Sequence, residues 1–95
     1  MDSIFEATAS QYAVSADEYV GFRSGAAGRD MAAYLYRRYT SATLRELSDR
    51  FGLSHPDSVS DLIRRGAKRT EQSTEAVRQQ MVIEKKLGLN PESRT

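Results

Sequence analysis

Apolar residues recur along most of the chain at three- and four-residue spacing, the period of an α-helix that buries one face. Strand signals are weak, because valine and isoleucine are few and apolar and polar residues never alternate over a long stretch. Three segments fit a capping box, in which a hydroxyl and an acid three residues later satisfy the first backbone N–H groups of a helix. They begin at Ser3, Ser15 and Thr43. The pattern predicts an all-α domain of five to six helices.

The predicted helices cover residues 3–12, 15–21, 29–39, 43–51, 55–70 and 74–87. Their expected inward-facing residues are Ile4, Phe5, Ala9, Tyr19, Val20, Met31, Ala32, Leu35, Tyr39, Leu44, Leu47, Phe51, Val59, Leu62, Ile63, Val77, Met81 and Leu87. Ser54 is expected to cap the helix over 55–70, with Pro56 tolerated as its second residue because the first-turn N–H groups are unpaired. The polar end over 90–95 is expected to be loose.

Residues 43–70 carry the pattern of a helix-turn-helix. Apolar residues at helical spacing end in Phe51-Gly52-Leu53, and a second apolar series begins at Val59. Two helices that cross steeply need apolar side chains at the crossing and a sharp turn containing glycine. Counted from Gly52, the turn is one residue longer than in the shortest helix-turn-helix. The prediction is a recognition helix over 55–70 that enters the major groove of duplex DNA, although an ordinary helical hairpin can share the pattern.

Charge is unevenly distributed along the chain, although its net value is only +1. Residues 1–20 contain four acids and no base, residues 21–70 contain ten bases and five acids, and residues 71–95 contain four of each. Nine of the ten central bases are arginine, which favours bidentate contacts to phosphate or guanine. A basic centre indicates a polyanionic partner; the alternative is a solvated helical surface rich in arginine.

The candidate DNA-binding residues follow from this placement. Polar side chains early in a recognition helix suit base edges, and basic side chains farther along suit phosphates. On the free side of the helix these residues are Asp57, Ser58, Ser60, Asp61, Arg64, Arg65 and Lys68. Thr43, Arg45 and His55 complete the set, with Arg45 on the first helix of the motif and His55 at the turn.

Other classes of function find little support in the sequence. Cysteine is absent and His55 is the only histidine, so neither a thiolate metal site nor a base–nucleophile pair is expected. No phosphate-binding Gly-x-x-x-x-Gly-Lys-[Ser/Thr] loop occurs. Neither a membrane span nor a signal peptide is recognised. We therefore expect a cytoplasmic, nucleoid-associated protein that is not an enzyme and needs no cofactor or metal.

Residues 29–52 also resemble a known family. The matching landmarks are Arg29-Asp30-Met31-Ala32-Ala33-Tyr34-Leu35, Thr40, Leu44-Arg45-Glu46-Leu47 and Phe51-Gly52. They are similar in order and spacing to the C-terminal DNA-binding domain of the bacterial replication initiator DnaA, a Trp-repressor-like helix-turn-helix. Similar domains occur in transposases related to the REP-associated tyrosine class. The resemblance extends from Ile4 to about Leu87 and implies that Arg29 contacts the DNA backbone. Arg23 corresponds to what is left of the family's basic loop.

The turn departs from the family pattern. Where the family has Gly-Arg-Asp-His-Thr-Thr-Val, this chain has Leu53-Ser54-His55-Pro56-Asp57-Ser58-Val59. The family residues contact base edges, so the resemblance implies fold and DNA binding but not the same DNA sequence. The expected function is non-catalytic binding of double-stranded DNA. Two alternatives stay open: a protein-interaction module on the same fold, and a detached targeting domain of a transposase. Besides double-stranded DNA, a catalytic or replication protein is a further candidate partner.

Overall fold

The computed structural model describes residues 3–20 and 25–88, whose regular secondary structure is helical, with no strand among them. Its elements are α1 (Ser3–Gln11), the 3-10 turn η1 (Ala16–Tyr19), α2 (Arg29–Tyr39), α3 (Leu44–Arg50), α4 (Pro56–Gln72) and α5 (Thr74–Leu87). The predicted all-α domain is confirmed. Arg23 and the segment over 90–95 lie outside the described residues.

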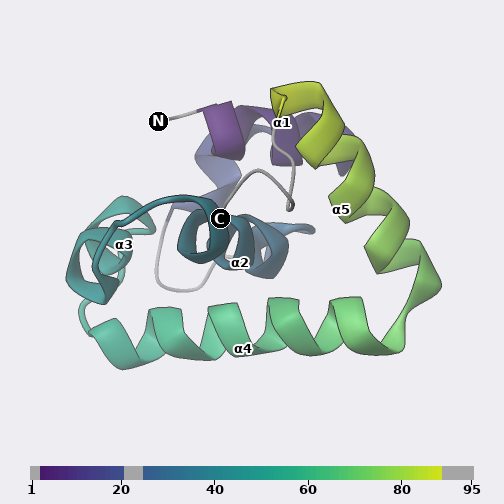
Figure 1. The fold of residues 1–95 in the computed structure, drawn as a ribbon. Helices are drawn as coiled ribbons and strands as arrows, with labels where there is room; N and C mark the ends of the chain where they lie inside the picture. The colour runs from purple at the N-terminus through teal and green to yellow at the C-terminus, as the bar shows by residue number, and fades with distance from the viewer. Residues whose placement is uncertain (1–2, 21–24, 89–95) are drawn as a thin grey trace.

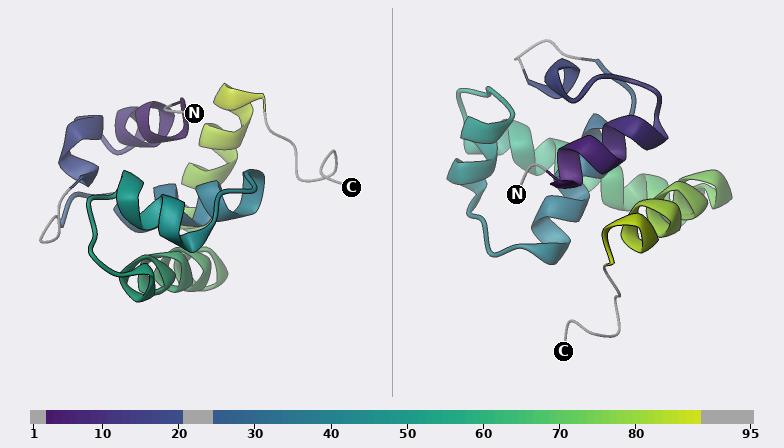
Figure 2. Two further views of the ribbon diagram at one scale, coloured as in Figure 1. Left: turned by 90° about the vertical axis from the view of Figure 1, so that its left-hand side faces the viewer. Right: turned by 90° about the horizontal axis from the view of Figure 1, so that it is seen from above.

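Helix α2 lies at the centre, with α4 along one side and α1 on the other (Figure 1). Helix α3 lies beside the N-terminal end of α4, and α5 returns from the C-terminal end of α4 to pack on α1. The left view of Figure 2 shows α4 nearly end-on as the lowest helix, with no other helix beneath it. Among the described elements, helix α4 therefore has one covered side and one free side.

Four aromatic rings form the centre of the core. The ring of Phe5 meets Tyr19, Tyr36 and Phe51 at centroid distances of 5.6, 5.4 and 4.9 Å, and the first two contacts are edge-to-face. All four residues are fully or almost fully buried. Since they come from α1, η1, α2 and the segment after α3, this cluster joins elements that are distant in sequence.

Helices α2 and α4 approach closely at Gly66. A Cβ atom added there would lie 2.5 Å from the backbone oxygen of Asp30 and 2.7 Å from Cβ of Tyr34. Val59 and Leu62 are buried on the same side of α4. Only glycine allows the two backbones this separation, so Gly66 sets how deeply α4 is seated on α2.

The predicted helix boundaries are largely correct. Helix α2 has the expected range and α5 covers the expected 74–87. Helix α4 differs at its start: His55 is its N-cap and Pro56 its first residue, so the expected Ser54 cap is wrong. Pro56 is well placed there, because proline has no N–H to leave unpaired in the first turn. Helix α4 also continues to Gln72, two residues past the expected end.

Three residues expected in the core are exposed: Val20, Val77 and Met81. Helix α5 instead buries Ala76 and Ile83, which are seven residues apart, together with the carboxylate of Glu84. Burial of Glu84 is tolerated because the Tyr39 hydroxyl and the Gln80 amide both donate hydrogen bonds to it. The inward side of α5 is therefore rotated relative to the side with the larger apolar residues.

Candidate nucleic-acid interface

Helices α3 and α4 are joined by residues 51–55. This connection is longer than the turn of the shortest helix-turn-helix. Gly52 has a φ of +68°. Its N–H donates to the carbonyl of Asp49 at 3.1 Å, and the N–H of Leu53 donates to Ser48 at 2.8 Å, which is a Schellman motif. Phe51 and Leu53 are both buried. The connection is thus fixed by hydrogen bonds and apolar packing, and it sets where α4 begins.

The free side of α4 carries charged residues at helical spacing. Val59, Leu62 and Gly66 are buried against the rest of the protein. Asp57, Asp61, Arg64 and Lys68 are exposed, and the helical period places them on the opposite side of α4. This side is where a large partner can reach the helix without any rearrangement of the protein.

The charges on α4 are only partly compensated. Nη1 of Arg64 lies 2.9 Å from Oδ1 of Asp61, in an ion pair between two exposed side chains. Among the described residues, the side chains of Arg65 and Lys68 form no hydrogen bond or ion pair. Because Asp57 and Asp61 lie near the N-terminus of α4, the uncompensated positive charge lies in the later turns.

The smaller candidates lie at the start of α4. Ser58 and Ser60 are half-buried on opposite flanks, and His55 is exposed with no side-chain hydrogen bond to the helix it caps. Asp57 is in the first turn, where its charge stabilises the positive end of the helix dipole. A structural contribution is thus evident for Asp57, whereas the exposed His55 side chain has none within the described residues.

Thr43 and Arg45 begin α3. The Thr43 hydroxyl accepts a hydrogen bond from the N–H of Glu46 at 3.1 Å, and the Glu46 carboxylate accepts one from the N–H of Thr43 at 2.9 Å. These bonds hold the pKa of Glu46 below its ordinary value and form the predicted capping box. Arg45 is exposed and, within the described part of the chain, its guanidinium has no partner. Thr43 therefore serves as a cap, and Arg45 is free to contact a ligand.

Arg29, which the family resemblance places on the DNA backbone, is buried in the structure and has a structural role. The side chain is 7% exposed. Its Nε donates to the carbonyl of Tyr19 at 3.0 Å and Nη2 donates to that of Phe51 at 3.4 Å, while the guanidinium lies 5.8 Å from the centre of the Phe51 ring. Burial, with a smaller contribution from the charge of Arg65, lowers the pKa of Arg29. Arg29 therefore joins η1 and the segment after α3 from inside the protein.

Arg69 was not among the predicted DNA-binding residues, and it lies one turn after Arg65 on the same flank of α4. Its Nη2 is 3.0 Å from Oδ2 of the buried Asp30 on α2. A hollow of about 210 Å³ lies beside this pair and is lined by Arg65, Arg69 and the segment over 25–28. The four-residue spacing of Arg65 and Arg69 could have indicated that they share a flank of α4. It could not have indicated that the segment over 25–28 lies opposite them.

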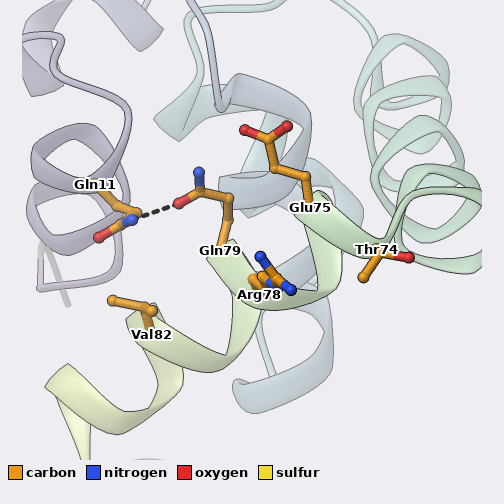
Figure 3. Close-up of a pocket in the computed structure, with 6 residues that line it drawn as sticks. All are labelled: Gln11, Thr74, Glu75, Arg78, Gln79 and Val82. Atoms are coloured by element: carbon orange, nitrogen blue, oxygen red, sulfur yellow. Dashed lines mark hydrogen bonds between the residues drawn. The ribbon is translucent and has the colours of Figure 1, made fainter.

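A second hollow, of about 490 Å³, lies between α1 and α5 (Figure 3). The Gln11 amide donates a hydrogen bond to Gln79 across it, and among the described residues Glu75 and Arg78 are its charged lining residues. Its described lining residues include no nucleophile paired with a base. In the part of the chain that the structure describes, no three histidine, cysteine or acidic residues form a metal-binding group, and no helix has the length and apolar character to cross a membrane.

Comparisons with protein-family models, with curated proteins and with solved structures found no match to this chain.

Proposed function

We propose that the protein binds double-stranded DNA without catalysis, that α3 and α4 act as a helix-turn-helix, and that α4 enters the major groove. The observation that carries this proposal is the free side of α4, which is uncovered beside a rigid turn. The helix has 17 residues, or about 25 Å of length. The major groove of B-DNA is about 12 Å wide and admits one α-helix. Such a function implies association with the nucleoid.

The order of side chains along α4 supports a division between base and backbone contacts. Ser58, Ser60 and Asp61 lie in the first turns, which usually approach base edges. Arg65 and Lys68 lie later and are uncompensated, as is Arg45 on α3. Basic side chains on either side of the base-contacting turns can hold the two phosphate strands that border the groove. The resemblance to the DnaA C-terminal domain is consistent with this arrangement.

Protein binding is a second candidate, and α5 provides the observation for it. Val77, Met81 and Val82 are 36%, 61% and 43% exposed. Exposed apolar side chains that gather on one helix are more typical of a protein contact than of a DNA contact. The acids Asp57 and Asp61 on the free side of α4 also oppose a polyanion.

Salt dependence separates the two candidates. If the protein docks on duplex DNA, its affinity for a mixed-sequence duplex should fall steeply between about 50 and 200 mM salt, because each phosphate contact releases counterions. Three contacts, from Arg45, Arg65 and Lys68, correspond to a log–log slope of roughly −2.7. Fluorescence anisotropy at several salt concentrations measures this slope. A flat response would reject DNA binding and favour the protein-interaction candidate.

Single substitutions distinguish base contacts from backbone contacts. Arg45→Ala should weaken binding to all duplexes about equally and reduce the magnitude of the salt slope by about 1. Ser58→Ala should instead change the preferred base at one position, by roughly 1–3 kcal/mol. A panel of duplexes with single-base changes, measured against both variants, gives the comparison. If Arg45→Ala altered the sequence preference and Ser58→Ala did not, the proposed orientation of α4 would be wrong.

A further inference from the structure

The hollow beside α4 lies between this helix and the start of α2, and its lining residues carry an excess of positive charge. We name it the arginine hollow and define it by Arg65 and Arg69 on α4, Arg29 and Asp30 at the start of α2, and the segment over 25–28. Its volume of about 210 Å³ is many times that needed for one water. It lies on a flank of α4, apart from the line formed by Asp57, Asp61, Arg64 and Lys68.

Three arginines line this hollow, and among its described lining residues only Asp30 carries a carboxylate. The carboxylate is already committed: Oδ2 lies 3.0 Å from both Nε and Nη2 of Arg69, and Oδ1 accepts a hydrogen bond from the N–H of Met31 at 2.8 Å. Arg29 is held by backbone carbonyls. Arg65 therefore contributes a positive charge that no described acid neutralises.

The positive charges of Arg65 and Arg29 also interact. The charge of Arg65 contributes to the lowered pKa of Arg29, after burial. The positive charges of Arg29 and Arg65 repel one another, and hydrogen bonds hold only Arg29 in place. An anion bound between or beside the two side chains would stabilise both charges. The N-terminus of α2 does not by itself supply the attraction, because Asp30 already occupies its first turn.

We propose that the arginine hollow binds one phosphate group, with Arg65 as its main ligand and Arg69 beside it. The planar guanidinium of arginine matches the geometry of phosphate oxygens and can donate two parallel hydrogen bonds. A phosphodiester of the DNA backbone is one source of this group, and in that form the inference rests on the proposed function. A free phosphate is the other source. Either ligand presents the same oxygens to Arg65.

Inorganic phosphate is the probe for the first experiment. Titrated into the isotopically labelled full chain at constant ionic strength, it should shift the amide resonances of Gly25, Ala27 and Arg69, whereas chloride should not. Arg65→Gln should weaken phosphate binding on the order of tenfold. Arg78→Gln removes the same charge from an exposed site on α5 and should leave the affinity unchanged. Equal shifts in the native chain and in Arg65→Gln would overturn the proposal.

A duplex titration identifies the source of the phosphate. If the bound phosphate group belongs to DNA, inorganic phosphate should compete with the duplex more strongly than chloride does. Arg65→Gln should then weaken the binding of both the duplex and inorganic phosphate. If it is free phosphate, Arg65→Gln should weaken the binding of phosphate alone, and Arg65 would not be one of the three DNA contacts counted above. Duplex binding with a steep salt dependence but no phosphate-induced shift would overturn the proposed phosphate site and leave the proposed function intact. Phosphate binding without duplex binding would support the hollow and reject the proposed function.

Discussion

Phe51→Ala should lower the free energy of unfolding by about 3–5 kcal/mol, the range for removing a buried phenylalanine from a site that cannot collapse. The side chain is 0% exposed and packs against Phe5 and Tyr36. It also lies beneath the guanidinium of Arg29. Collapse is hindered because its backbone carbonyl accepts a hydrogen bond from Arg29 while its N–H is bound to Leu47.

Chemical denaturation followed by circular dichroism measures this loss. Met81→Ala is the control: it also shortens a large apolar side chain on a helical protein, but at a residue that is 61% exposed, so the change should stay within about 0.5 kcal/mol. If Phe51→Ala were as mild as Met81→Ala, Phe51 would not be a core residue. The described turn between α3 and α4 would then be wrong, and the proposed DNA interface would lose its support.

Helix positions could be predicted from the sequence where local signals agree. For α3, the Thr43 capping box and Gly52 mark the two ends, and both depend only on neighbouring residues. The side of α5 that is buried could not be predicted in this way. Val77 and Met81 have helical spacing, but α5 is positioned by contacts with α1 and by the hydrogen bond from Tyr39 to Glu84. These partners are distant in sequence.

The candidate site shows the same limit. The exposed residues of α4 could be predicted because Val59 and Leu62 fix its inward side, and the other residues follow from the helical period. The burial of Arg29 could not be predicted from the sequence. It depends on the carbonyls of Tyr19 and Phe51, which the fold brings together. Arg69 was missed for a related reason: its relevance depends on Asp30 and on the segment over 25–28, which tertiary packing places beside α4.

Gly66→Ala should destabilise the protein by about 1–3 kcal/mol, the usual cost of inserting a methyl group into a packed interface. In an exposed helix interior the same change stabilises by roughly 0.5–1 kcal/mol, so the expected sign is reversed. The reason is the backbone oxygen of Asp30, 2.5 Å from the added Cβ. A backbone oxygen cannot rotate away, and α4 must therefore move from α2. That movement would also stretch the ion pair between Asp30 and Arg69.

Gly25→Ala is the matched control, because a Cβ atom there would have no neighbour within 4 Å. Removing backbone freedom from the unfolded chain at an unstrained position is neutral or slightly stabilising. Thermal unfolding of both variants, compared with the native chain, should therefore show a lower midpoint for Gly66→Ala alone. A higher midpoint for Gly66→Ala would mean that α2 and α4 lie farther apart than described. The free side of α4 would then have to be assigned again, because its orientation depends on the residues that seat it on α2.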